Sequence, residues 1–316
     1  MPTPPSAVLA TRNSAFAEMV RRGLNLRQKQ LDPSFFYDAL GSALFDAITR
    51  LPEYTITRAE LTLLQTHGPA ILAPFPEPIE LIELGPGNGE KLSTLVEHAP
   101  GATVHLIDVS AAALRAAALT IERACDVRPT TFIGTFQDGL RELPRRSRRR
   151  LVLFLGSNLG NFAPAEAQEF LRSIHASLAP GDALLLGADL VKSDSVLLAA
   201  YDDPLGVTAA FNKNILVRMN RELGANFDLA AFDHRAIWNA AASRIEMHLV
   251  SLIDQRVAIP ALELTVPFAA GETIWTESSH KYREAALRQL VEGAGFQEHA
   301  AWVHDEHRFS ESLFFA

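Results

Sequence analysis

The chain has 316 residues, of which 48% are hydrophobic, so it is long enough for two domains or one large one and can bury a real core. The net charge of −8 argues against nucleic acid as a partner, because a phosphate backbone is bound by clustered positive charge. One cysteine, Cys125, excludes a disulfide framework within the chain and any metal site built from several cysteines, and we interpret it as an idle thiol.

No stretch is apolar over the ~20 residues that a membrane-spanning helix needs. Residues 1–6 are rich in proline and lack the basic region and long apolar core of a signal peptide. A cytoplasmic protein with no membrane partner is the simplest expectation. The run of arginines at 145–150 is interpreted as a solvated turn before a strand, because no aromatic residues are interleaved with it.

The N-terminal part of the chain has the pattern of helices. Over 38–51 the apolar residues recur at helical spacing. Residues 57–60, Thr-Arg-Ala-Glu, form the pattern of a capping box ahead of the apolar run that begins at Leu61. We therefore expect a second helix to start at Thr57.

Short apolar strands then alternate with amphipathic helices, which is the pattern of a doubly wound, mostly parallel α/β sheet. Strands of such a sheet are buried on both faces and therefore read as continuous apolar runs. The strands are expected at 79–84, 104–107, 131–133, 151–155 and 183–187, and the helices at 91–97, 111–124 (capped by Ser110) and 165–178.

The alternation breaks after about Leu190, where longer runs at 244–253 and 257–268 follow a different rhythm. A helix at 284–293 and apolar segments around Trp302 and at 309–315 then suggest a return to the sheet. The sequence thus predicts an α/β domain interrupted by an inserted α+β unit. We expect residues 59–190 and 282–316 to form the first domain, and residues 1–58 and 191–281 to form the second.

The sharpest local motif is the loop at 83–89, Glu-Leu-Gly-Pro-Gly-Asn-Gly, which follows an expected strand and opens an expected helix. Its glycines let the backbone turn tightly and approach a ligand without a Cβ clash. Ligands of open α/β sheets bind at the carboxyl ends of the strands, where this loop lies. We predict cofactor contacts from Glu83, Gly85, Gly87, Gly89 and Asp108.

Two kinds of cofactor compete for this loop. A dinucleotide would prefer two residues between the second and third glycines and would place its pyrophosphate on the helix N-terminus. Glu83 would repel a pyrophosphate but suits a ligand with a cationic amino-acid end, such as S-adenosylmethionine. Asp108 closes the second strand and can accept from ribose hydroxyls of either cofactor, so it does not discriminate between them.

With these residues in view, the chain resembles the histidine-specific methyltransferase family, the S-adenosylmethionine-dependent L-histidine Nα-methyltransferases of ergothioneine biosynthesis. The resemblance runs from about Phe35 to the C-terminus and is much more specific than the glycine loop. The segments that carry it are 36–39 (FYDA), 51–54 (LPEY), 83–91, 154–161, 189–192 (DLVK), 200–203 with 211–212, 244–247 (RIEM) and 276–279.

The resemblance implies a class I, Rossmann-like methyltransferase domain with a substrate domain made from the N-terminal helices and an insertion. It implies three methyl transfers to the α-amine of L-histidine, which give the betaine hercynine. S-adenosylmethionine would be the co-substrate, and no metal would be needed. We expect a monomer.

Site residues are implied by the same resemblance, position by position. Lys91 and Gly85 would hold the cofactor's amino-acid end, Asp108 its ribose, and Gly156 and Ser157 lie in a matched cofactor segment. Family members have an aspartate where this chain has Thr135, before Phe136, to bind the adenine amino group. Threonine can accept through its hydroxyl or leave that contact to the backbone.

For the substrate, the resemblance assigns the grip on amine and carboxylate to Tyr37, Asn161 and Tyr201, which are the expected catalytic residues. Tyr54 and Phe211 would line the pocket, with Met247 beside the imidazole. Glu277 and Ser279 would bind that ring. This pair makes chemical sense, because an imidazole needs partners that can both donate and accept.

Other functions remain open at this point. One alternative is an N-methyltransferase for tryptophan or another aromatic amino acid. Others are a non-catalytic S-adenosylmethionine-binding protein and a dinucleotide-dependent oxidoreductase. His304 and His307 have the spacing of a weak metal motif, but no third ligand is suggested nearby, so we interpret them as part of a solvated turn.

Overall fold

A computed structural model describes residues 5–75, 78–145 and 148–316, and side chains from residue 15 onward. Two members of the arginine run, Arg146 and Ser147, therefore lie outside the described residues, as do positions 1–4 of the proline-rich start. The chain divides into two compact units. The sheet unit is Thr49–Ser193, Ala240–Arg244 and Ser279–Ala316, and the insert unit is Met1–Ile48, Asp194–Asn239 and Ile245–Ser278.

A seven-stranded sheet forms the centre of the sheet unit, in the order β12-β13-β6-β5-β2-β3-β4. Strands β2 to β6 are parallel to one another, whereas β13 pairs antiparallel with both β6 and β12. The bounds are β2 Glu80–Leu84, β3 Thr103–Asp108, β4 Thr130–Ile133, β5 Arg150–Phe154, β6 Ala183–Asp189, β12 Gln297–His304 and β13 Phe309–Phe315.

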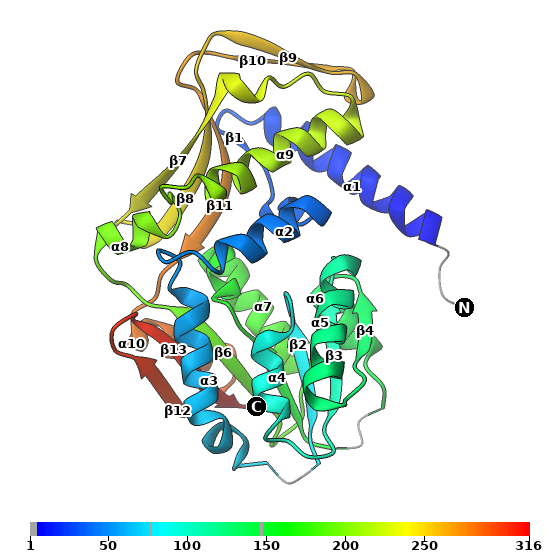
Figure 1. The fold of residues 1–316 in the computed structure, drawn as a ribbon, viewed down its shortest axis with the longest axis vertical. Helices are drawn as coiled ribbons and strands as arrows, with labels where there is room; N and C mark the ends of the chain where they lie inside the picture. The colour runs from blue at the N-terminus through cyan, green and yellow to red at the C-terminus, as the bar shows by residue number, and fades with distance from the viewer. Residues whose placement is uncertain (1–4, 76–77, 146–147) are drawn as a thin grey trace. The chain divides into compact units, whose positions relative to one another are not determined.

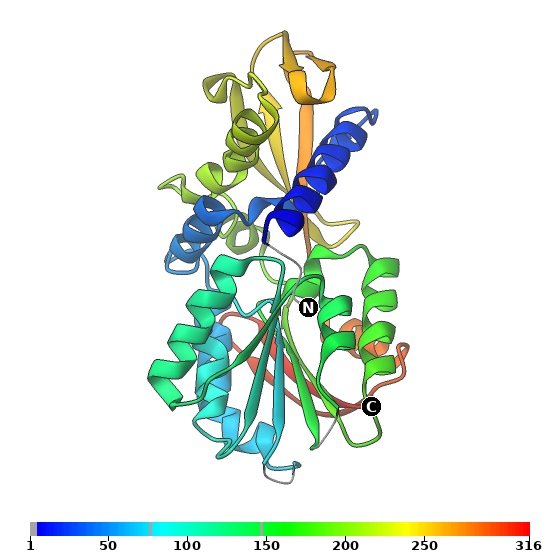
Figure 2. The same ribbon diagram turned by 90° about the vertical axis from the view of Figure 1, so that its right-hand side faces the viewer.

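Helices cover both faces of this sheet (Figure 2). One core contains residues of α3 Ile56–Leu72, α4 Glu90–Val96 and α5 Ala111–Cys125, and the other contains residues of α6 Phe136–Glu142, α7 Pro164–Ser177 and α10 Glu284–Glu292. Successive side chains of a strand point to opposite faces, so Leu81 and Leu151 join the first core while Ile82 and Val152 join the second. Burial on both faces explains why apolar residues dominate the central strands of this sheet.

The insert unit has a four-stranded sheet in the order β1-β11-β8-β7 and a separate antiparallel pair, β9 with β10 (Figure 1). Its strands are β1 Lys29–Gln30, β7 Phe232–Asn239, β8 Arg244–Ser251, β9 Gln255–Ile259, β10 Leu264–Phe268 and β11 Thr273–His280. Its helices are α1 Pro5–Leu24, α2 Ala39–Ile48, α8 Asp194–Ala199 and α9 Val207–Leu223, with short 3-10 helices η1 Pro33–Phe36, η3 Leu229–Ala231 and η4 Pro260–Leu262.

The predicted order of strands and helices is confirmed, and so is the α/β class with a second α+β unit. The Ser110 cap is also confirmed, because its hydroxyl accepts from the amide of Ala113 at 3.3 Å. The predicted capping box at Thr57 is wrong. Helix α3 begins one residue earlier, at Ile56, with Thr55 at the N-cap, and Glu60 is fully buried and bonded to other elements.

Unit boundaries lie near the predicted domain boundaries without coinciding with them. Residues 49–58 group with the sheet unit, as do 191–193, 240–244 and 279–281. The division of labour between a cofactor domain and a substrate domain stays a prediction. In the described part of the chain, no helix is long and apolar enough to cross a membrane.

The third glycine of the loop allows two helices to approach closely. Gly89 is the N-cap of α4, with φ of +80°, and a Cβ at this position would lie 2.8 Å from the Cα and the carbonyl oxygen of Ala117 in α5. Gly87 also has a positive φ, +57°, but a Cβ there would meet nothing within 4 Å. A side chain at either position would strain the backbone, but only a side chain at Gly89 would also clash with α5. Substitutions at the two glycines therefore distinguish the two effects.

We expect Gly89→Ala to lower the free energy of unfolding by about 1–3 kcal/mol more than Gly87→Ala, because only the former overpacks the α4–α5 contact. Urea denaturation of both variants, followed by far-UV circular dichroism, measures the difference. Equal losses in the two variants would show that positive φ alone requires the glycine.

Candidate functional site

The glycine loop lies at the carboxyl end of β2, the central strand at which the order of the parallel strands reverses. From β2 the chain runs outward through β3 and β4, whereas β5 and β6 lie on the other side. Such a switch point leaves a crevice outside the strand ends. Gly85, Gly87 and Gly89 all have positive φ values, which glycine adopts at no steric cost.

Several predicted cofactor residues lie together around this loop. A Cβ at Gly85 would lie 3.5 Å from the ring of Phe136, and one at Gly156 would lie 3.0 Å from Nζ of Lys91. Asn158, which the sequence analysis missed, joins them, because its Nδ2 would lie 3.3 Å from a Cβ at Gly85 and 3.8 Å from one at Gly156. Asn158 begins the 3-10 helix η2 Asn158–Asn161, which follows β5 after residues 155–157.

Glu83, just before the loop, is fully buried in β2. Neither of its carboxylate oxygens has a hydrogen-bond partner among the described residues. Burial raises the pKa of Glu83 to about 8, and the nearby Lys91 opposes this rise. A buried carboxyl that lacks donors is costly unless it serves a ligand, so Glu83 is suited to meet a cation at the loop.

Three other predicted cofactor residues already have partners within the sheet unit. Asp108 accepts from the amide of Ser110 at 2.7 Å. The Thr135 hydroxyl caps α6, accepting from the amide of Asp138 at 3.2 Å and donating to its carboxylate at 2.7 Å. Ser157, with φ of +58°, accepts from the amide of Asp189. These bonds position the loops that follow β3, β4 and β5.

Of the predicted substrate residues, Tyr54, Asn161 and Ser279 belong to the sheet unit. Asn161 ends η2, and Tyr54 is buried just before α3. Ser279 is also buried, and its Oγ accepts from Nζ of Lys281 at 3.0 Å. Lys281 in turn pairs with Asp189, at 2.9 Å. The hydroxyl oxygen of Ser279 is therefore held in place by a lysine that is itself fixed by an ion pair.

In the insert unit, an aromatic cluster surrounds Phe211 of α9. Its ring centroid lies 4.7 Å from Phe36, 5.7 Å from Tyr37 and 6.0 Å from Phe45. The Tyr37 ring also meets Phe45 edge-on at 5.6 Å. Two residues predicted for the substrate pocket, Tyr37 and Phe211, are thus in direct contact.

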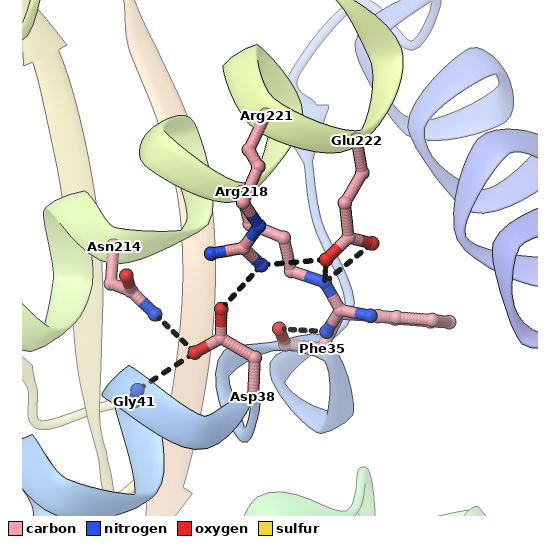
Figure 3. Close-up of polar contacts among 7 residues, drawn as sticks. All are labelled: Phe35, Asp38, Gly41, Asn214, Arg218, Arg221 and Glu222. Carbon is pink, nitrogen blue, oxygen red and sulfur yellow. Dashed lines mark hydrogen bonds and ion pairs between the residues drawn. The ribbon is translucent and has the colours of Figure 1, made fainter. Parts of the chain in front are cut away.

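The residue after Tyr37 anchors this segment to α9 (Figure 3). Oδ1 of Asp38 accepts from the amide of Gly41 at 2.8 Å and from Nδ2 of Asn214 at 2.9 Å, and Oδ2 accepts from Arg221 at 2.7 Å. Burial alone would raise the pKa of Asp38, but these hydrogen bonds hold it below its ordinary value. Asp38 thus stays ionised and fixes the backbone that carries Tyr37.

Arg218 of α9, one helical turn after Asn214, binds the same η1–α2 segment. Its Nη1 donates to the carbonyl of Phe35 at 2.7 Å, and its Nε pairs with Glu222 (Figure 3). The guanidinium also lies 4.5 Å from the ring centroid of Phe16, which is a cation–π distance. Helix α9 therefore holds the η1–α2 segment through charged side chains on successive turns.

A buried polar network links Tyr201 to the strands of the insert unit. His234 joins the carbonyl of Tyr201 at 2.8 Å through Nε2 and Nδ2 of Asn212 at 2.8 Å through Nδ1. Oδ1 of Asn212 accepts from Thr276 at 2.7 Å, and the Thr276 hydroxyl also lies 2.9 Å from the carbonyl of Met247. Every member is buried, as is required of a network that fixes side chains in one arrangement.

The network decides the tautomer of His234. Nδ2 of Asn212 also donates to the carbonyl of His248, which fixes the amide orientation because a carbonyl only accepts. Nδ1 of His234 must therefore accept, and Nε2 carries the proton that is donated to Tyr201. The ring is neutral, in agreement with burial, which lowers the pKa of His234 below its ordinary value of 6.5.

Four predicted substrate residues depend on this network. Tyr201 and Met247 are held by their carbonyls, while Phe211 and Glu277 are chain neighbours of Asn212 and Thr276. Glu277 also accepts, through its carbonyl, from the indole of Trp275 at 2.8 Å. Met247 itself is buried in β8.

Comparison with known proteins identifies the family. A model of the family described as "Histidine-specific methyltransferase, SAM-dependent" matches residues 16–316. The chain belongs to this family. The resemblance noted from its sequence motifs is thereby confirmed, and so is S-adenosylmethionine as the co-substrate.

Individual relatives extend this result over most of the chain. Histidine N-alpha-methyltransferase of Mycolicibacterium smegmatis is 45% identical over 300 residues, which cover 93% of this chain and 92% of that protein. The protein of the same name from Mycobacterium tuberculosis is 44% identical, with the same coverage. Ergothioneine biosynthesis protein 1 of Schizosaccharomyces pombe is 30% identical over 86% of this chain and 37% of that protein.

The sheet unit of this histidine-specific methyltransferase suits S-adenosylmethionine for a reason visible in the structure. The buried Glu83 carboxyl has no donor in the part of the chain that the structure describes, and the cofactor's amino-acid end brings one as an ammonium group. The open space beside Gly87 lets the backbone approach a ligand. Among the described residues, no group of three His, Cys, Asp or Glu side chains could hold a metal ion.

The sequence analysis missed Glu60, Glu311, His234 and Asn212, besides Asn158. Glu60 was assigned to a helix cap. Glu311 gave a usable signal, since it is the one charged residue of the expected strand 309–315, and it is fully buried there. His234 gave none, and Asn212 lay in the matched segment 211–212 without a sign of its role, because their partners are distant in the sequence.

Protonation of His234 would place an N–H against the N–H of Asn212. Because the folded-state pKa is depressed, this histidine contributes stability above pH 6.5 that is lost as pH falls through its folded pKa. We expect hydrogen exchange of the β8 peptide to accelerate below that pH in the wild type relative to His234→Gln, which cannot titrate.

His105→Gln is the matched control. His105 is a buried histidine of the sheet unit whose pKa burial also lowers. This variant should leave the acid sensitivity of β8 exchange unchanged. An identical pH profile for β8 in the wild type and His234→Gln would remove His234 as its cause.

Proposed function

We propose that this protein transfers methyl groups from S-adenosylmethionine to the α-amine of L-histidine, three times in succession, to give hercynine. The observation that carries the proposal is the family match over residues 16–316. Relatives at 44–45% identity, named histidine N-alpha-methyltransferase, support the substrate. A monomeric state and a cytoplasmic location stay predictions.

For the cofactor, we assign the amino-acid end to Gly85 and Lys91 and the ribose to Asp108. Lys91 pairs with Glu60 at 2.7 Å and has two further N–H donors for a carboxylate. Because the Thr135 hydroxyl is engaged with Asp138, we assign the adenine contact to the backbone at 135–136.

For the substrate, we assign the amine and carboxylate of histidine to Tyr37, Asn161 and Tyr201, and the imidazole to Glu277 and Ser279. Ser279, whose oxygen accepts from Lys281, can donate its hydroxyl proton to the unprotonated ring nitrogen. Glu277 can accept from the other, protonated nitrogen. The remaining pocket residues are Tyr54, Phe211 and Met247.

The cofactor supplies a methyl group on a sulfonium, which is activated for direct transfer to an amine. The protein's contribution is then mainly alignment, because orientation alone can provide a large part of such a rate enhancement. Tyr37 is held by Asp38 and by aromatic contacts, so its hydroxyl can fix the amine. Aromatic faces at Tyr37 and Phe211 stabilise the quaternary ammonium that repeated methylation builds.

The proposal is tested by incubating the purified protein with S-adenosylmethionine and an equal mixture of the standard amino acids, followed by mass spectrometry. We expect histidine alone to gain three methyl groups. Methylation of tryptophan instead would keep the cofactor and overturn the substrate assignment. Binding of S-adenosylmethionine without any methylation would favour the non-catalytic alternative.

Glu277→Ala should raise the KM for histidine by about 10- to 100-fold, the range expected when a hydrogen bond to a carboxylate is lost. The affinity for S-adenosylmethionine, measured by calorimetry, should change little. Glu292→Ala, an exposed glutamate at the end of α10, serves as control and should leave both constants unchanged. An unaltered histidine KM in Glu277→Ala would exclude the imidazole role.

A further inference from the structure

A buried cluster of charged side chains lies within the sheet unit. Its members come from four elements: Glu60 from α3, Glu83 from β2, Lys91 from α4 and Glu311 from β13. The three glutamates are each 0% exposed. The cluster thus combines several carboxyl groups with one cation in the interior, an expensive arrangement unless the charges are matched.

Glu60 is the carboxylate with a full set of partners. Its Oε2 pairs with Nζ of Lys91 at 2.7 Å, and its Oε1 accepts from the amide of Gly156 at 2.6 Å. Burial alone would lower the pKa of Lys91, but the attraction of Glu60 raises it. Glu60 and Lys91 therefore form an ion pair that uses the cluster's cation.

The carboxyl groups of Glu311 and Glu60 both lie close to Gly187, where the missing side chain leaves room for them. A Cβ at Gly187 of β6, which pairs with Glu311 in the sheet, would lie 2.1 Å from Oε1 of Glu60 and 2.9 Å from Oε1 of Glu311. Neither oxygen of Glu311 has a hydrogen-bond partner among the described residues. Burial first, and then Glu60, raise the pKa of Glu311 well above 4.5. A protonated Glu311 becomes a donor toward Glu60.

Glu83 also has no donor in the described part of the chain, and most of the charged groups that act on it are negative. Lys91 faces it from α4 and favours its ionisation, whereas Glu60 from α3 and Asp108 from β3 oppose it. The positive charge of Lys91 is already matched by the Glu60 carboxylate. An ionised Glu83 would therefore add a buried negative charge that no cation of the cluster compensates. The protein without cofactor therefore keeps a proton on Glu83 at neutral pH, consistent with its pKa of about 8.

We propose that Glu83 loses its proton when S-adenosylmethionine binds and that its carboxylate then pairs with the cationic amino-acid end of the cofactor. Glu311, next to Glu60, keeps its proton. The O–H bond of Glu83 breaks, the proton passes to the buffer, and the carboxylate faces the cofactor's ammonium. Cofactor affinity is thereby linked to pH through a proton that the protein releases. This inference rests on the cofactor of the family and is independent of the proposed substrate.

Isothermal titration calorimetry of S-adenosylmethionine binding, without histidine, tests the exchange. Titrations at about pH 7, where the cofactor's own α-amine is still protonated, are run in two buffers that differ in ionisation enthalpy. The difference in heat gives the number of protons released, and we expect about one per cofactor bound. The dissociation constant should rise about tenfold when the pH is lowered by one unit.

Two matched variants identify the group. Glu83→Gln, a neutral isostere of the protonated side chain, should abolish proton release and flatten the pH dependence of binding. Glu311→Gln changes the same kind of side chain in the same cluster and should leave proton release unchanged, with thermal unfolding as a check that both variants fold. Equal heats in both buffers for the wild type, or undiminished release from Glu83→Gln, would overturn the proposal.

Discussion

The burial of one carboxylate, that of Glu60, is the constraint on which the glycine-loop end of the sheet unit depends. It satisfies Lys91 of α4 and the amide of Gly156 after β5 from a position on α3. Without it, a buried ammonium and a backbone amide would both lose their partner, and each such loss costs on the order of 1–3 kcal/mol or more. The space it occupies exists because residue 187 is a glycine, so a strand on the opposite side of β5 from β2 takes part in holding the loop region.

The buried networks of the two units hold their side chains by different physical means, although ion pairs also anchor the η1–α2 segment of the insert unit. The sheet unit uses charge: its glutamates and Lys91 are coupled, and their protonation depends on each other. The insert unit holds Tyr201 and Met247 through a chain of neutral dipoles, in which the donor and acceptor sites used by Asn212 and His234 are matched one to one. A neutral network of this kind is directional and tolerates burial at small cost, whereas a charged cluster can respond to a ligand of opposite sign.

Much of the fold could be predicted from the sequence because it follows local rules. Strands β5 and β6 contain unbroken apolar runs, Ser110 caps its helix through a bond three residues away, and the glycine loop has a recognisable spacing. The start of α3 was misjudged because burial of Glu60 overrides the capping pattern around Thr57. The pairing of Asp38 with Arg221 spans 183 residues, and no local pattern indicates which distant side chain will arrive beside Tyr37. Similarly, the protonation of Glu311 depends on Glu60, which becomes its neighbour only in the folded protein.

Strand β13 has a consequence for how the molecule is made. It is the last element of the chain, yet it lies inside the sheet, between β12 and β6. The seven-stranded sheet cannot be completed before residues 309–315 have been synthesised. Until then β6 has an unpaired edge, and β12 has no strand to pair with. Such late, long-range pairing slows folding and exposes strand edges to aggregation. A chain whose synthesis stops shortly before Phe309 therefore contains the whole glycine loop. It lacks β13, the strand that pairs with β6.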